Sequence, residues 1–241
     1  MSAMPSLHCE NLGLRLNGTT ILDGLDAVIP PAGVTALIGP NGAGKSATLR
    51  VIDGLIPPTS GRMRIIADGP VRRAFVFQRP ALVRASALAN VALGLVPLKL
   101  PRTEREARSH AALARVGLAH RARDPATRFS GGEQQRLALA RAWAVEPDLL
   151  LADEPTANLD PAATELVEGL IADMAARGTK VVLVSHNLGQ VMRLAADVLV
   201  LARGKAVEHG PARAILTSPQ RPETRAYLSG ELPWTSFAAA S

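Results

Sequence analysis

Several features common in secreted and membrane proteins are absent from this chain of 241 residues. Its single cysteine, Cys9, excludes an internal disulfide and a cysteine-based zinc site. No stretch approaches the roughly 18 unbroken apolar residues of a membrane-spanning helix. The N-terminus lacks a basic segment leading into an apolar run, so we expect no signal peptide. These absences indicate a globular protein of a reducing cytoplasm.

Aromatic residues are also scarce, at 3% of the chain, and none occurs before Phe75. The hydrophobic fraction of 47% therefore predicts a core built mainly from Leu, Val, Ile and Ala. The formal net charge is +6, and arginines gather between residues 102 and 128 with Glu104, Glu106 and Asp124 among them. A solvated helical face explains most of this run, although an anionic surface, either nucleic acid or lipid headgroups, is an alternative.

A glycine-rich segment of the form G-x-x-x-x-G-K-S is the most informative feature that is present. It follows the apolar run 34–38, which predicts a buried strand, and it precedes the start of a predicted helix. Glycines let backbone N–H groups close around a polyphosphate, and the helix N-terminus adds partial positive charge. The sequence therefore predicts nucleoside triphosphate binding by Gly39, Pro40, Asn41, Gly42, Ala43, Gly44, Lys45 and Ser46. Lys45 is expected to reach the β- and γ-phosphates, and the Ser46 hydroxyl to bind Mg²⁺.

Apolar runs and helical patterns alternate along the chain. The runs 149–152, 181–184 and 198–201 are typical of parallel strands, with helical stretches near 161–177 and 188–195. This alternation predicts an α/β fold with a mostly parallel core sheet. Strand-like segments with turns at 7–33 predict an N-terminal antiparallel β-subdomain. Residues from about 86 to 146 predict a helical insertion within one domain spanning residues 1–241.

An acidic pair follows the apolar run 149–152. Asp153 ends a buried strand, from which a carboxylate can hold Mg²⁺ through water. Glu154, one residue further, can orient and deprotonate an attacking water. Acidic residues after strands are common as simple surface caps. The phosphate loop upstream is what makes a role for this pair in nucleotide hydrolysis the favoured interpretation.

The segment Ser130-Gly131-Gly132-Glu133 opens another predicted helix. Ser130 as N-cap with Glu133 three residues later predicts an ordinary capping box. The free N–H groups of a glycine-rich helix start can also receive an anion. Both interpretations can hold together.

These motifs, in this order, resemble those of the ATP-binding subunit of an ABC transporter over nearly the whole chain. Residues 129–136 resemble the family's signature, with Phe129 where Leu is commoner and Glu133 where Gln is commoner. The resemblance implies that Gln78 belongs to the glutamine loop, which contacts Mg²⁺ and the attacking water. It also implies that Asp160 lies in the loop that crosses the dimer.

The same resemblance identifies His186 as the switch histidine at the γ-phosphate, with Asn187 in place of the more usual Asp. It implies ATP and Mg²⁺ as cofactors and a homodimer in which Ser130, Gly131, Gly132 and Glu133 of one copy face the ATP bound by the other. It further implies a peripheral position at the cytoplasmic face of the inner (plasma) membrane. There the partners are permease subunits and, indirectly, a periplasmic or extracellular substrate-binding protein.

Two positions at the nucleotide depart from the family. Relatives usually stack the adenine on an aromatic side chain, and the matching residue is Leu16. Relatives also usually carry Thr or Ser at the position of Ala47, to reach the α-phosphate. Thr48 lies about 100° further round the helix, so we expect no substitution from it.

Cargo is expected from local similarity alone. The stretches 77–82, 185–190 and 227–234 resemble bacterial oxyanion importers, tungstate-type most closely, which favours import of tungstate or molybdate. Phosphate or polar amino-acid import is the alternative. A soluble nucleic-acid-associated ATPase is a remote one, because the chain lacks coiled-coil heptads and zinc-binding cysteines, so no nucleic acid is expected.

Overall fold

A computed structural model describes residues 4–230, which form two compact units. The first unit joins the chain up to Pro70 with the chain from Lys180 onward, and the second is Val71–Thr179. Residues 231–234, which carry part of the expected oxyanion-importer similarity, lie outside the described range. Among residues 4–230, no helix has the length and apolarity needed to cross a bilayer.

A three-stranded antiparallel sheet forms the N-terminal part of the first unit. Its order is β2 (Thr19–Ile29), β1 (Ser6–Leu16) and β4 (Ser60–Ile66). Asn17 and Gly18 join β1 to β2, with positive φ angles of 48° and 81°. Such a two-residue turn matches the right-handed twist of the strands it connects. The expected antiparallel β-subdomain is therefore present.

Three parallel strands and one antiparallel edge strand form the rest of the described sheet structure in the first unit. β3 (Val34–Ile38) pairs in parallel with β7 (Lys180–Val184) on one side and with β8 (Asp197–Ala202) on the other. All five residues of β3 are buried, as a continuous apolar run predicts. An antiparallel edge strand, β9 (Lys205–Pro211), extends this group beside β8. Sequence analysis did not identify β9, whose residues mix charged and apolar types.

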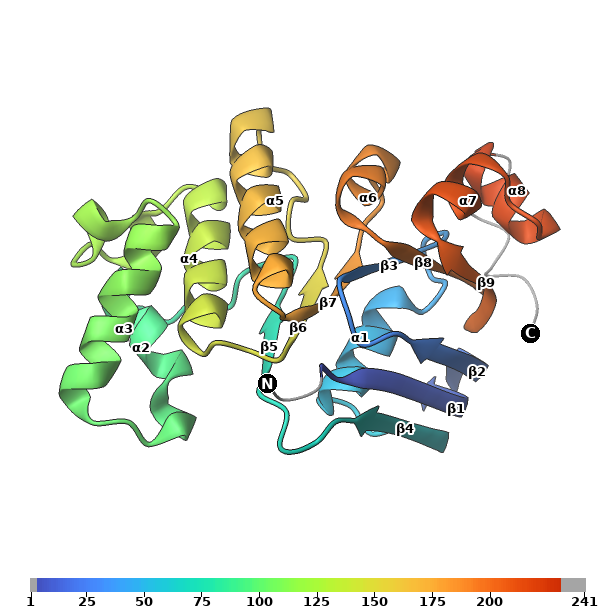
Figure 1. Cartoon of the computed structure of the whole chain (residues 1–241), viewed down its shortest axis with the longest axis horizontal. Helices are drawn as coiled ribbons and strands as arrows, with labels where there is room; N and C mark the ends of the chain where they lie inside the picture. Colours follow the sequence, from blue (N-terminus) through green and yellow to red (C-terminus); the bar gives the residue numbers. More distant parts are fainter. Residues whose placement is uncertain (1–3, 231–241) are drawn as a thin grey trace. The chain divides into compact units, whose positions relative to one another are not determined.

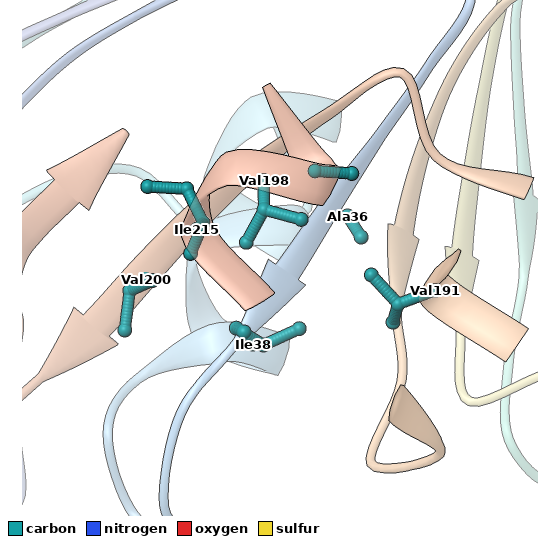
Figure 2. Packing of buried hydrophobic residues seen from close by; sticks show 7 residues of the cluster. Ala36, Ile38, Val191, Val198, Val200 and Ile215 are labelled. Atoms are coloured by element: carbon teal, nitrogen blue, oxygen red, sulfur yellow. The ribbon is translucent and has the colours of Figure 1, made fainter. Parts of the chain in front are cut away.

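Helices pack on these parallel strands. α1 (Lys45–Asp53) contacts β7 as well as β2 and β4, whereas α7 (Ala212–Thr217) packs on β8 and β9 beside α6 (Leu188–Leu194) (Figure 1). Figure 2 shows the resulting core, in which Ile38 of β3 and Val198 of β8 meet Val191 of α6 and Ile215 of α7. α8 (Pro222–Leu228) follows and contacts β9. This packing fixes the carboxyl end of β3, from which the glycine-rich loop departs.

The second unit contains two strands and most of the long helices. β5 (Arg73–Val76) and β6 (Leu149–Asp153) pair in parallel. α2 (Ala87–Gly94), α3 (Arg102–Arg115) and α4 (Gly131–Ala144) pack on one another, and α5 (Pro161–Ala176) packs on α4 (Figure 1). Three short 3-10 helices, Val96–Leu98, Ala119–Arg121 and Ala126–Arg128, connect them.

Several arginines of this helical region form ion pairs within the unit. Arg108 pairs with Glu104 at 2.9 Å and with Glu146 at 3.4 Å. Arg115 pairs with Asp173 and lies 5.0 Å from the ring centre of Trp143. These contacts agree with a solvated, internally paired helical face.

Candidate functional site

The glycine-rich loop lies where a buried parallel strand gives way to a helix. Gly39 has φ of 140°, and a Cβ added there would lie 2.0 Å from the carbonyl oxygen of Leu201 on β8. Gly44, the N-cap of α1, has φ of 97°, and its added Cβ would lie 2.7 Å from Leu22. Only glycine fits such positions without displacing its neighbours. The tight curvature follows from these two residues.

Lys45 is folded over this loop. Its side chain is 6% exposed, and its Nζ donates hydrogen bonds to the carbonyl oxygens of Gly39 at 2.7 Å and Pro40 at 2.9 Å. No side chain caps α1, and its first turn holds no acidic residue. The first turn of α1 therefore contributes no carboxylate of its own to oppose the positive end of the helix dipole, which suits an incoming phosphate.

The structure describes the positions at which the sequence departs from the family, Leu16 and Ala47, together with the neighbouring Thr48. Leu16 ends β1 with its side chain 42% exposed. Thr48, by contrast, is fully buried and its hydroxyl donates to the carbonyl oxygen of Gly44 at 2.9 Å. Since that hydroxyl points back into its own helix, it does not replace the hydroxyl missing at Ala47.

His186 follows β7 on an exposed turn. Its neighbours hold the turn in place: the Asn187 side chain accepts from the backbone N–H of Gln190 at 3.0 Å and caps α6. The Ser185 hydroxyl donates to the side chain of the buried Gln190 at 2.7 Å. Asn caps a helix about as well as Asp, so Asn187 preserves the local structure beside His186.

In the second unit, the strand register brings Gln78 and Glu154 together. Val76 of β5 is paired with Ala152 of β6, and each candidate residue lies two positions further along its chain. The Gln78 amide donates to the Glu154 carboxylate at 3.0 Å. Asp153, the last residue of β6, is only 5% exposed, and Glu154 takes a left-handed φ of 47°. The pairing of β5 with β6 therefore places Gln78 beside Glu154.

The Ser130 segment forms the predicted capping box at the start of α4. The Ser130 hydroxyl accepts from the Glu133 N–H at 3.3 Å, and the Glu133 carboxylate accepts from the Ser130 N–H at 2.8 Å. A Cβ added at Gly132 would lie 3.0 Å from Ala163 of α5, so this glycine lets two helix starts approach closely. Asp160 caps α5, accepting from the Ala163 N–H at 2.8 Å.

The candidate residues thus form two sets. The phosphate loop, Ala47, Leu16 and His186 belong to the first unit, and the remaining candidates belong to the second. Arg121 bonds to Glu133 at 2.6 Å. The sequence did not indicate this role, because Arg121 lies within the run of arginines interpreted as a solvated helical face. No spacing rule connects a residue of a 3-10 helix to a helix start 12 positions later.

A phosphate loop between strand and helix, followed by an acidic strand end, defines a P-loop protein that binds a nucleoside triphosphate. Residues 22–157, more than half of the chain, match the family model described as ABC transporter. A phosphate import ATP-binding protein of Mycobacterium tuberculosis is 36% identical, over 95% of this chain and 90% of the relative. The chain therefore belongs to the ABC transporter family and is an ATP-binding subunit with ATPase activity.

Two further comparisons agree. The ATP-binding protein of an Escherichia coli L-cystine transport system is 34% identical, over 93% of this chain and 98% of that protein. An ATP-binding cassette solved as a dimer with ADP and phosphate has a TM-score of 0.77 and 28% identity, covering 86% of this chain and 99% of that one. The relatives confirm the fold class, but they do not support the expected tungstate specificity.

Proposed function

We propose that this chain is the ATP-hydrolysing subunit of an importer, working as a homodimer on a membrane permease. The single observation that carries the hydrolytic role is the hydrogen bond from Gln78 to Glu154 beside a buried Asp153. It groups an amide with a carboxylate that can act as base, at the end of a strand where hydrolytic groups of this protein class are needed. Membership of the ABC transporter family supports the coupling of this hydrolysis to transport.

The phosphate loop would hold the triphosphate, with Lys45 moving from its loop carbonyls to the β- and γ-phosphates. The oxygen donors of Ser46, Gln78 and Asp153 suit Mg²⁺, which prefers oxygen ligands and retains several waters. Mg²⁺ would neutralise charge on the phosphates when bound. Glu154 would accept a proton from the attacking water, and His186 would contact the γ-phosphate.

Half of the γ-phosphate contacts would come from a second copy of the chain. The helix start at Ser130, Gly131 and Gly132 presents N–H groups to an anion, and Asp160 would take part in the loop that crosses the dimer. The similarity to a cassette solved as a dimer with ADP and phosphate supports this arrangement. A single set of motifs makes a homodimer the simplest assembly.

The dimer would lie peripherally at the cytoplasmic face of the membrane, with a binding protein delivering cargo outside. The relatives favour phosphate or a polar amino acid as cargo over tungstate or molybdate, because they include phosphate and L-cystine systems. In vesicles with the cognate permease and binding protein, phosphate or cystine should stimulate hydrolysis more than tungstate does. Stimulation by tungstate alone would reverse this preference.

Substitution of Glu154 by Gln tests the hydrolytic role. Because an amide cannot accept the water's proton, kcat should fall by about 10²–10⁴-fold while ATP binding persists. Glu165→Gln makes the same chemical change at an exposed position of α5 and should leave hydrolysis unchanged. Steady-state phosphate release is measured beside nucleotide titration. Equal turnover in the Glu154 variant and the wild type would refute the assignment.

A further inference from the structure

Both departures from the family's signature contact one arginine. Arg121, the last residue of a short 3-10 helix, donates from its guanidinium to Glu133 at 2.6 Å. The same guanidinium lies 4.3 Å from the ring centre of Phe129. Its Nε also donates to Asp124 at 2.8 Å. The unusual acid and the unusual aromatic residue therefore share a partner.

This contact completes the hydrogen bonding of Glu133. One carboxylate oxygen accepts from the Ser130 N–H and the other accepts from Arg121. The side chains of Arg121 and Glu133 are only 23% and 21% exposed, so water screens their interaction less than that of a fully exposed pair. The Ser130 N–H and Arg121 lower the pKa of Glu133 to about 2. Glu133 is therefore an anion at any physiological pH.

An anion at this position opposes the function of the segment. The helix start at Ser130 would receive the γ-phosphate of an ATP bound by a second copy, and a carboxylate one turn away repels that charge. A neutral Gln, which is commoner in the family, creates no such repulsion. A cation bonded directly to the Glu133 carboxylate offsets part of this repulsion.

We propose that Arg121 is a positioning residue for the signature segment: it neutralises Glu133 and keeps the Ser130 cap in the shape that receives the γ-phosphate. This inference rests on the proposed contact between Ser130–Gly132 and ATP. Phe129 supports the flat face of the guanidinium, and such stacking favours arginine over lysine. Arg121 would act through Glu133 and the Ser130 cap rather than by contact with the nucleotide.

A double-mutant cycle tests the proposal. In the wild-type background, Arg121→Gln should raise KM for MgATP by about tenfold, with a smaller change in kcat, because an uncompensated carboxylate faces the phosphates. In the Glu133→Gln background, the same substitution should raise KM by less than about twofold, since no carboxylate remains at the helix start and Asp124 lies outside the Ser130–Glu133 segment. The penalty in the wild-type background should shrink at high salt.

Arg123→Gln is the matched control, because it makes the same change in net charge at an exposed residue of the same segment. Its KM should remain that of the wild type. Arg121→Lys keeps the charge and should retain a KM within about threefold, which keeps the proposal testable if the Gln variant folds poorly. Thermal unfolding of each variant reports folding separately.

Three results would overturn the inference. One is an equal KM for the Arg121→Gln and Arg123→Gln variants. Another is an equal rise in KM for the Arg121→Lys and Arg121→Gln variants. The third is a tenfold penalty that persists in the Glu133→Gln background, because that would show a packing role independent of charge. Failure of the proposed function looks different: Ser130→Ala would then leave KM for MgATP unchanged.

Discussion

Lys180 offers a stability test in which a single buried ammonium is removed. It begins β7 with none of its surface exposed, and its Nζ donates to the Thr35 hydroxyl at 2.6 Å and the Ala32 carbonyl oxygen at 3.0 Å. Thr35 donates onward to the Asp197 carboxylate at 2.9 Å, and His209 contacts that carboxylate at 2.9 Å. These four side chains contact one another in sequence across the neighbouring strands β7, β3, β8 and β9.

Burial lowers the pKa of Lys180 from 10.5 to about 8, and the nearby Asp197 carboxylate opposes part of that decrease. Between these two pH values the unfolded chain keeps the lysine proton and the folded chain loses it. The free energy of unfolding contributed by Lys180 therefore rises with pH across this window. At about 1.4 kcal/mol per pH unit, the rise amounts to at most about 3 kcal/mol.

Lys180→Met removes this dependence while keeping a long apolar stem. Urea unfolding of the variant and the wild type at a series of pH values from 7 to roughly 10.5 gives the difference in free energy. The wild type should gain up to about 3 kcal/mol relative to the variant as pH rises. Burial also raises the pKa of Cys9 to about 12, which lowers stability with rising pH above about 9, but that effect cancels because both proteins contain Cys9.

Lys99→Met, at an exposed lysine, is the control for loss of a positive charge. A stability difference between wild type and the Lys180 variant that stays constant across the pH range would refute the reasoning. It would mean that Lys180 carries the same number of protons in the folded and unfolded chain.

Two further predictions concern nucleotide binding. Leu16→Tyr should tighten ATP binding by the isolated subunit by about tenfold or more, because base–aromatic stacking is worth roughly 1–3 kcal/mol; unchanged, strongly adenine-selective titration curves would contradict it. Gly39→Ala should lower the free energy of unfolding by at least about 1–3 kcal/mol, since its Cβ would lie 2.0 Å from the Leu201 carbonyl oxygen. Urea unfolding measures this loss, and wild-type stability in the variant would show that the loop adjusts freely.

Local patterns in the sequence predicted the parts of the site that depend on neighbours along the chain. The strand before Gly39 and the helix after Lys45 follow from apolar runs and glycine placement, and the Ser130 cap follows from its spacing to Glu133. The Gln78–Glu154 contact needs the register of two strands that are far apart in sequence, which no local pattern encodes.

Long-range polar contacts were not predictable for the same reason. Arg121 and Lys180 gain their environments from residues on other elements, and their sequence neighbours suggest only a charged surface and an ordinary strand start. Strand β9 was not predicted because its residues, none of them fully buried, mix charged and apolar types and form no continuous apolar run.

The departures from the family's motifs are of two kinds. At some positions another contact of the folded chain compensates for the unusual residue, and at others none does among the described residues. Asn187 caps α6, and Glu133 is paired with Arg121, so both preserve a local structure by other means. For Leu16 and Ala47 the described residues show no such compensation: no aromatic residue precedes Phe75, and the Thr48 hydroxyl is bonded within α1. Asn187 and Glu133 thus contribute to local structure, whereas Leu16 and Ala47 would face the nucleotide. Weak recognition of the base, with affinity carried by the phosphates, is therefore expected without any loss of stability.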